Sequence, residues 1–103
     1  MPSRVDSNQA QIVAELRQMG CAVQSLASVR DGCPDLLVSF RGCNYLFEVK
    51  DPKQPPSKRQ LTKLEKKWHE EWRGQVHVIH NTKEALAVIL KQDKQKEIIS
   101  EVI

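Results

Sequence analysis

The stretch that decides the fold runs from residue 32 to residue 50 and reads GCPDLLVSFRGCNYLFEVK. Two short apolar strands flank an Arg41-Gly42 turn, so the stretch predicts a β-hairpin. Asp35 opens the first strand, and Glu48 and Lys50 close the second. Apolar residues alone would form such a hairpin, so the two acids and the lysine at its open end need a separate explanation.

Strand geometry predicts that these three polar side chains lie on one face. Side chains alternate along a strand, so Glu48 and Lys50 share a face and Val49 points the other way. A two-residue turn would pair Asp35 with Glu48, whereas a four-residue turn would pair Asp35 with Lys50. Either turn keeps all three side chains together, and a three-residue turn would put the two acids on opposite faces.

Two carboxylates in directly opposed positions suggest a cation site. Their Cβ atoms lie roughly 4.5–5.5 Å apart, so they repel and the pKa of one of them rises unless a cation lies between them. Mg²⁺ takes oxygen ligands from one or two carboxylates, water and phosphates. We therefore predict a Mg²⁺ or Mn²⁺ site at Asp35 and Glu48, with Lys50 beside it. The alternative is an ordinary strand end with a surface ion pair, worth about 0–1 kcal/mol.

Length and composition predict one soluble globular domain. The chain has 103 residues, of which 40% are hydrophobic and 28% charged, with a formal net charge of +3. We expect a core over about 4–91 and a tail over 92–103, polar at first and then apolar. The three cysteines are odd in number and lack C-x-x-C spacing, which favours reduced thiols in the cytoplasm over disulfides or zinc. No stretch is apolar enough for a signal peptide or a membrane span.

The order of periodic segments predicts a helix, three strands, a helix, a strand and a helix. The first helix covers 7–19, capped by Asp6 or Ser7, and the first strand covers 22–26. After a proline-rich loop over 51–57, a helix starts at one of two capping-box patterns, at Ser57 or at Thr62. A strand over 75–80, with Val76 and Val78 on one face, and a helix capped by Asn81 complete the domain.

Apolar spacing predicts which side chains of the last two helices face the core. In the helix after the proline-rich loop these are Leu61, Leu64, Trp68 and Trp72. In the last helix they are Ala85, Leu86, Ile89 and Leu90. For the two tryptophans a place in the core is favoured over stacking on nucleic-acid bases.

Pro34-Asp35 and Glu48-Val49-Lys50, in this order of elements, resemble the PD-(D/E)xK nuclease superfamily. More closely, the chain resembles the small stand-alone VRR-NUC nucleases of phages, which are similar to Holliday junction resolvases. The matching text covers about residues 4–90 and consists of GCPDLLV at 32–38, YLFEVK at 45–50, PPS at 55–57, LT at 61–62 and WH to WRG over 68–74.

The resemblance implies an α/β fold with a restriction-endonuclease-like core. It consists of elements in the order α-β-β-β-α-β-α, with a four-stranded mixed sheet flanked by helices. It also implies that Asp35, Glu48 and the Val49 carbonyl bind Mg²⁺, for which Mn²⁺ can substitute. Lys50 would orient or help to deprotonate the attacking water, and the products would be a 5′-phosphate and a 3′-hydroxyl.

Two positions depart from the family pattern. Gln9 stands where relatives usually carry a glutamate that faces the metal, so it is a neutral candidate ligand, and Glu15 is a less well oriented substitute. Glu65 stands where relatives tend to have glutamine, and the sequence gives no physical account of that change.

A basic run beside the predicted site suggests a phosphate track. Between residues 50 and 67 the chain carries Lys50 and six further cations against two acids, Asp51 and Glu65. The predicted DNA-binding residues are Lys53, Lys58, Arg59, Lys63, Lys66 and Lys67. The alternative is a solvated helix face.

These observations favour a metal-dependent DNA endonuclease that hydrolyses phosphodiester bonds, acts on branched or four-way DNA, and forms a homodimer. Dimerisation follows from the resemblance, from the apolar tail and from the need to cut two strands with a one-site chain. The competing hypothesis is a catalytically weak or inactive nucleic-acid-binding module, which Gln9 supports. A third is a subunit that assembles with another protein through residues 98–103, although that tail could also fold back on its own domain.

Overall fold

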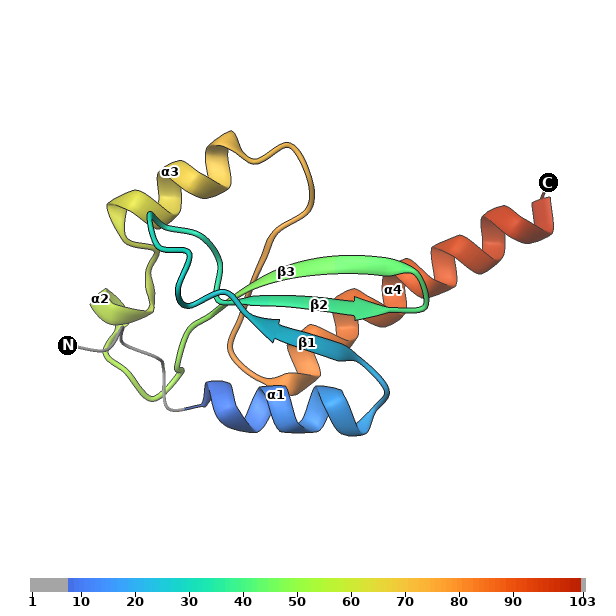
Figure 1. Ribbon diagram of the computed structural model, residues 1–103, viewed down its shortest axis with the longest axis horizontal. Helices are drawn as coiled ribbons and strands as arrows, with labels where there is room; N and C mark the ends of the chain where they lie inside the picture. The colour runs from blue at the N-terminus through green and yellow to red at the C-terminus, as the bar shows by residue number, and fades with distance from the viewer. Residues whose placement is uncertain (1–7, 103) are drawn as a thin grey trace.

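The computed structural model describes residues 8–102 and confirms the predicted order of elements (Figure 1). It adds one short helix, α2, after the proline-rich loop. The elements are α1 (Gln9–Gln18), β1 (Ala22–Ser25), β2 (Leu36–Phe40), β3 (Cys43–Val49), α2 (Pro56–Arg59), α3 (Lys63–Glu71), β4 (His77–Ile79) and α4 (Thr82–Val102).

The sheet is four-stranded and mixed, with strands in the order β1-β2-β3-β4. β1, β2 and β3 pair antiparallel, whereas β4 joins β3 in parallel. Phe40 pairs with Cys43, which confirms the two-residue turn. Arg41 and Gly42 both have positive φ, at 48° and 81°, as a type I′ turn requires.

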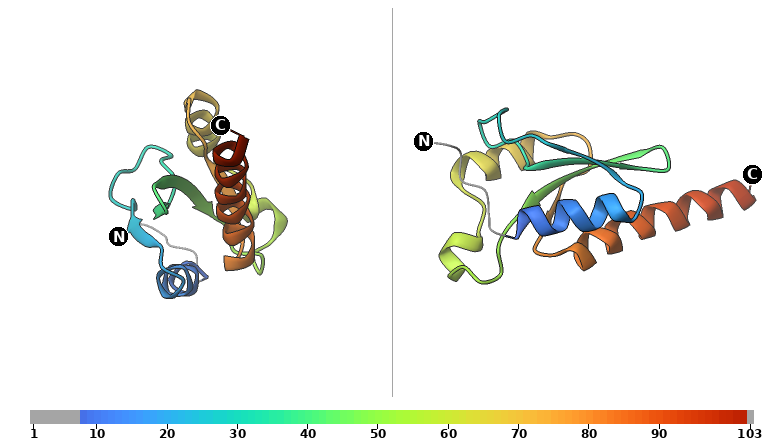
Figure 2. Two further views of the ribbon diagram at one scale, coloured as in Figure 1. Left: turned by 90° about the vertical axis from the view of Figure 1, so that its right-hand side faces the viewer. Right: turned by 60° about the horizontal axis from the view of Figure 1, so that its bottom comes forward.

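The hydrophobic core lies between one face of the sheet and the pair α1 and α4. The right-hand view of Figure 2 shows the two helices side by side in front of the sheet. Alternation along β2 and β3 sends every second side chain, from Leu36 to Phe40 and from Cys43 to Val49, to this face. The buried members are Ile12, Leu16, Cys21, Leu36, Val38, Tyr45, Phe47, Val49, Ile79, Ala85 and Ile89. In β4 the buried side chain is Ile79, while Val78 lies exposed on the opposite face.

The starts of the helices confirm the capping predictions in part. Asp6 and Ser7, the predicted caps of α1, lie outside the described residues, and Asn8 precedes the helix without a side-chain cap bond. Of the two capping-box patterns, the one at Thr62 forms, with the Thr62 and Glu65 side chains each accepting the other's backbone N–H. α2 starts after Pro55 and has no side-chain cap.

The predicted core seam of α3 is wrong. None of its residues is buried, Leu64 is exposed, and Trp72 keeps 46% of its surface exposed. Trp68 and Trp72 instead stack on each other, with ring centroids 4.5 Å apart. The reason is that α3 approaches the rest of the domain through its first turn, where the Leu64 backbone abuts Gly32, rather than along its whole length.

The last helix also differs from the prediction. Ala85 and Ile89 are buried as expected, but Leu90 is 56% exposed. The helix does not end near residue 91: α4 continues to Val102, because Lys, Gln and Asp side chains do not interrupt a helix. Its far half projects past the tip of the β2–β3 hairpin with Ile98 and Ile99 exposed, so these two do not fold back on the domain (Figure 1). Ile103 lies outside the described residues.

Cys21, Cys33 and Cys43 are free thiols, as predicted. Within residues 8–102, no helix has the length and apolar character needed to span a lipid bilayer.

Candidate metal and catalytic site

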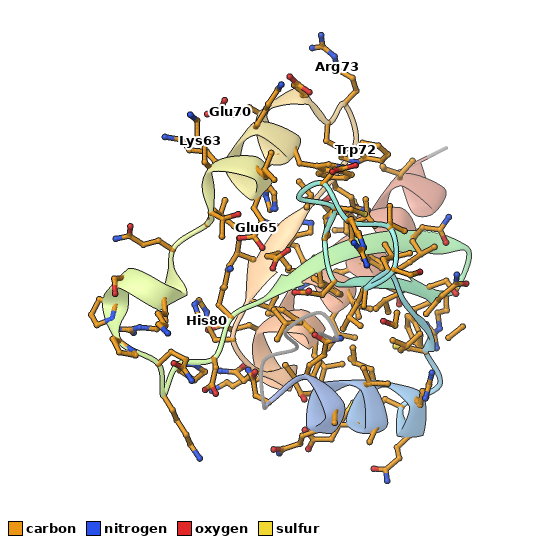
Figure 3. All side chains as sticks on the ribbon, turned by 60° about the vertical axis from the view of Figure 1, so that its left-hand side comes forward. Lys63, Glu65, Glu70, Trp72, Arg73 and His80 are labelled. Atoms are coloured by element: carbon orange, nitrogen blue, oxygen red, sulfur yellow. The ribbon has the colours of Figure 1, made fainter. Side chains whose placement is uncertain are left out.

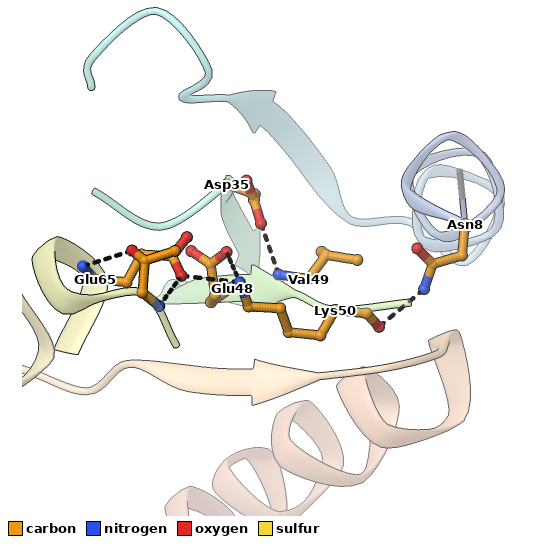
Figure 4. Close-up of polar contacts among 7 residues, drawn as sticks. Asn8, Asp35, Glu48, Val49, Lys50 and Glu65 are labelled. Carbon is orange, nitrogen blue, oxygen red and sulfur yellow. Dashed lines mark hydrogen bonds and ion pairs between the residues drawn. The ribbon is translucent and has the colours of Figure 1, made fainter. Parts of the chain in front are cut away.

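The structure brings Asp35, Glu48, Val49 and Lys50 together where β3 ends (Figure 4). The Val49 N–H donates to Asp35 Oδ2 at 2.7 Å. Lys50 Nζ lies 3.8 Å from Glu48 Oε2. Glu48 and Lys50 are nonetheless buried, with 2% and 7% of their surfaces exposed, which excludes the surface ion pair as an explanation.

The sheet register explains why the two acids meet. Leu36 pairs with Phe47, so one further step sets Asp35 opposite Glu48. Because Phe40 and Cys43 flank a two-residue turn, they form a hydrogen-bonded pair, and alternation makes the Asp35–Glu48 position a non-hydrogen-bonded one. Side chains approach most closely at such positions.

Pro34 interrupts the hydrogen-bond ladder between β2 and β3 at the next position. One more step of the register sets Val49 opposite Pro34 in a hydrogen-bonded position. Proline has no N–H, so Pro34 cannot donate to the Val49 carbonyl, while the Val49 N–H already donates to Asp35. The regular ladder therefore ends at the site and leaves the Val49 carbonyl without a donor from this strand.

The electrostatics of Glu48 are those of a carboxylate that lacks a matching cation. Its pKa is raised from 4.5 to about 10, first by burial and then by hydrogen bonding to Asp35 and by the charges of Asp35 and Glu65, and Lys50 offsets only part of this rise. Glu48 Oε1 is buried and has no hydrogen-bond partner among the described residues. The Cys33 thiol lies near the same acids, and its pKa is raised by burial and then by the charges of Glu48 and Asp35.

Glu65 is a member of this site that the sequence pattern did not identify. Its Oε1 accepts from Lys50 Nζ at 2.8 Å and from the Thr62 N–H at 2.8 Å. Burial alone would raise the pKa of Glu65, but the hydrogen bonds from Lys50 and Thr62 outweigh it and the pKa is lowered. The capping-box pattern at Thr62 predicted the backbone contact, while no local pattern could predict the contact with Lys50, fifteen positions away.

Gln9 starts α1 beside the same end of β3. Its neighbour Asn8 donates from Nδ2 to the Lys50 carbonyl at 3.2 Å and to the His80 carbonyl at 2.8 Å. Gln9 is 6% exposed, and its Oε1 is buried without a hydrogen-bond partner among the described residues. The less well oriented candidate, Glu15, is already engaged, because its Oε1 accepts from the Thr82 hydroxyl at 2.6 Å.

The predicted DNA-binding residues lie on three successive segments of the chain. Lys58 and Arg59 belong to α2, and Lys63, Lys66 and Lys67 belong to α3, where Figure 3 shows Lys63 pointing into solvent. Lys53 lines a separate pocket of about 450 Å³ between the start of α1, residues 51–53 and the start of α4. Asp35, Glu48 and Lys50 do not line that pocket.

A hard divalent cation at this site would have to be bound by oxygen atoms from several kinds of group. Within residues 8–102, no three His, Cys, Asp or Glu side chains gather to hold a metal ion by themselves. Two carboxylates, one backbone carbonyl and one amide oxygen are however all oxygen donors, which Mg²⁺ and Mn²⁺ accept. The buried, unpartnered Oε1 atoms of Glu48 and Gln9 fit this role, because a buried polar atom without a partner is costly.

A comparison with solved structures supports the fold. A solved structure described as a VRR_NUC domain has 30% sequence identity and a TM-score of 0.52, and the match covers 79% of this chain and 88% of that chain. Models of known protein families give no match to the sequence, and neither do curated proteins.

The mixed sheet, the order of its helices and the match to that solved structure define a nuclease-type domain with a restriction-endonuclease-like core. The chain belongs to the VRR-NUC family.

Proposed function

We propose that this protein is a Mg²⁺-dependent DNA endonuclease, with Mn²⁺ able to substitute. The observation that carries the proposal is the buried Glu48 carboxylate, which faces Asp35 and has one oxygen without a hydrogen-bond partner among the described residues. A carboxylate in such a place is destabilising unless it binds a cation. Asp35, Glu48, the Val49 carbonyl and Gln9 would hold that cation.

The bound cation would polarise the scissile phosphate and stabilise the leaving oxygen. The chain's own groups would do the rest. Lys50, whose ammonium group lies 3.8 Å from Glu48 Oε2, would donate to a phosphate oxygen or orient the attacking water. The Val49 N–H holds the Asp35 carboxylate in the orientation that faces Glu48.

We propose branched DNA as the substrate. The stacked pair Trp68 and Trp72 supports this, because Trp72 is 46% exposed and directly follows α3, the helix whose first turn contacts Lys50 through Glu65. Figure 3 shows Glu65 on α3 and Trp72 where the chain leaves that helix. Exposed aromatic rings stack on unpaired bases, with about 1–3 kcal/mol per base. Lys58, Arg59, Lys63, Lys66 and Lys67 on α2 and α3 would contact the backbone phosphates.

We also propose a homodimer, since one chain carries one site and a branched duplex has two strands to cut. The exposed Ile98 and Ile99 on the projecting half of α4 support a contact there. A cytoplasmic location accords with the three free thiols.

The test is incubation of labelled linear, flapped and four-way DNA with Mg²⁺, Mn²⁺ or EDTA. We expect cleavage with either metal ion, a preference for the branched substrates, and none with EDTA. Asp35→Asn should lower cleavage by at least about 10³-fold, because it removes a charge from the cation site while an amide oxygen can still accept from Val49.

Asp35→Ala removes both the charge and the acceptor of the Val49 N–H. Comparing it with Asp35→Asn therefore separates the effect of the charge from that of the hydrogen bond. Circular dichroism should show that both variants remain folded. Full activity in either variant, or undiminished cleavage in EDTA, would refute the metal mechanism. DNA binding without cleavage under every condition would favour the alternative of a catalytically inactive nucleic-acid-binding module, to which the neutral Gln9 points.

A further inference from the structure

Glu65 and Glu48 both lie within 4.0 Å of the buried Lys50 ammonium group. Its Nζ lies 2.8 Å from Glu65 Oε1 and 3.8 Å from Glu48 Oε2. The side chains of Lys50 and Glu48 are 9% and 3% exposed, so little water separates them. In the close-up of the site, Lys50 extends from β3 toward Glu65 on α3 (Figure 4).

The position of Glu65 is fixed independently of Lys50. The Thr62 N–H donates to Glu65 Oε1 at 2.8 Å, and the Glu65 N–H donates to Thr62 Oγ1 at 3.2 Å. The backbone of the same helical turn abuts Gly32, where an added Cβ would lie 2.3 Å from the Leu64 carbonyl oxygen. The turn that carries Glu65 is therefore held both by its own cap and by the loop that leads to Asp35.

We propose that Glu65 is a positioning residue that holds the Lys50 ammonium group away from Glu48 and so leaves the Glu48 carboxylate open to a divalent cation. This inference rests on the proposed function, because it assumes the cation site at Asp35 and Glu48. Glu65 itself touches neither substrate nor cation in this account.

Loss of Glu65 would leave Glu48 as the nearer acid for a buried ammonium group. Moving Lys50 Nζ from 3.8 Å to ordinary ion-pair distance would occupy the Glu48 oxygens. At an effective dielectric constant of about 20, an approach of about 1 Å at this range corresponds to roughly a tenfold change in binding. The cation would then have to displace an internal ion pair.

The experiment measures Mn²⁺ binding by isothermal titration calorimetry on the full chain without DNA. Four proteins are compared: wild type, Glu65→Ala, Lys50→Met and the double variant. We expect Glu65→Ala to weaken Mn²⁺ binding about tenfold, and the double variant to recover wild-type affinity or better, because the competing ammonium group is then gone. Circular dichroism of all four proteins checks that each is folded, so that the comparison concerns Mn²⁺ affinity and not folding.

Two further variants keep the test decisive. Thr62→Ala removes the hydroxyl that caps α3 but keeps the contact between Glu65 and Lys50, so its Mn²⁺ affinity should equal that of wild type. If Glu65→Ala does not fold, Glu65→Met, alone and with Lys50→Met, carries the same comparison, because methionine is close to glutamate in size and cannot hold the ammonium group.

Unchanged affinity in Glu65→Ala, failure of Lys50→Met to rescue it, or absence of Mn²⁺ binding by the wild type would each overturn the inference. These outcomes are distinct from a failure of the proposed function. A chain that binds Mn²⁺ with the expected pattern but cleaves no DNA would sustain the inference and refute the nuclease activity. A chain that cleaves DNA with no effect of Glu65 on Mn²⁺ would do the reverse.

Discussion

The two faces of the sheet differ in what they bury. The face toward α1 and α4 is closed by apolar side chains, including the fully buried Phe47 and Val49 of β3. The opposite face carries Glu48, between those two residues in sequence, and Lys50, both buried with their charges close together. The first face stabilises the fold, whereas the second retains polar groups whose burial is unfavourable and which we propose as the site of a divalent cation. Neighbouring residues of one strand thus serve stability and function separately.

Phe47→Ala should have the larger effect on stability and would test the core face. Removing a fully buried aromatic side chain costs about 3–5 kcal/mol of unfolding free energy, through lost burial and the cavity left behind. Urea denaturation measures this loss. Phe47→Leu is the matched control, with a loss of about 1–1.5 kcal/mol. Equal stability of Phe47→Ala and wild type would contradict the assignment of this face as the core.

Glu48→Gln should act in the opposite direction on stability. The pKa of Glu48 rises from 4.5 to about 10 on folding, so its contribution is most favourable below pH 4.5 and is lost as the pH rises toward 10. At neutral pH in EDTA the folded protein must keep this group protonated well above its unfolded pKa, and Glu48→Gln removes that cost. The variant should therefore have an unfolding free energy about 1–3 kcal/mol higher than that of wild type. Urea denaturation at several pH values should show that wild type loses stability more steeply with rising pH than the variant.

Glu48→Gln should also lose DNA cleavage while it gains stability. This result would distinguish the role of this face of the sheet from that of the core face. A Glu48→Gln protein that is less stable than wild type in EDTA would contradict the account of a carboxylate strained by burial. So would a pH dependence of stability identical to that of wild type.

The hairpin could be predicted from the sequence, and so could the face of the sheet that carries Asp35, Glu48 and Lys50, which we call the acid face. Both follow from local rules. Alternation along β3 separates Glu48 from Phe47 and Val49, and the Arg41-Gly42 turn sets the register that brings Asp35 opposite Glu48. The predicted meeting of Asp35, Glu48 and Lys50 therefore depends only on a stretch in which these residues lie within fifteen positions of one another.

The sequence failed where the outcome depended on distant elements. Leu64, Trp68 and Trp72 have the spacing of a buried helix face, but the spacing does not reveal whether a sheet lies beneath it. Leu90 likewise fits the core side of α4 by period and is exposed. The contact between Glu65 and Lys50 joins α3 to β3, and only the placement of the first turn of α3 against Gly32 creates it.

The departure at Glu65 now has a physical account. Its carboxylate caps α3 and pairs with the buried Lys50 ammonium group, so a charged acid here satisfies two donors at once.

The central claim is that the acid face is built for one divalent cation. The most direct measurement is anomalous scattering from crystals soaked in Mn²⁺, which locates the ion without reference to activity. The account predicts a manganese peak within coordination distance of the Asp35 and Glu48 carboxylates. Soaked crystals without a peak at that place, or with Asp35 and Glu48 turned into separate surroundings, would contradict it.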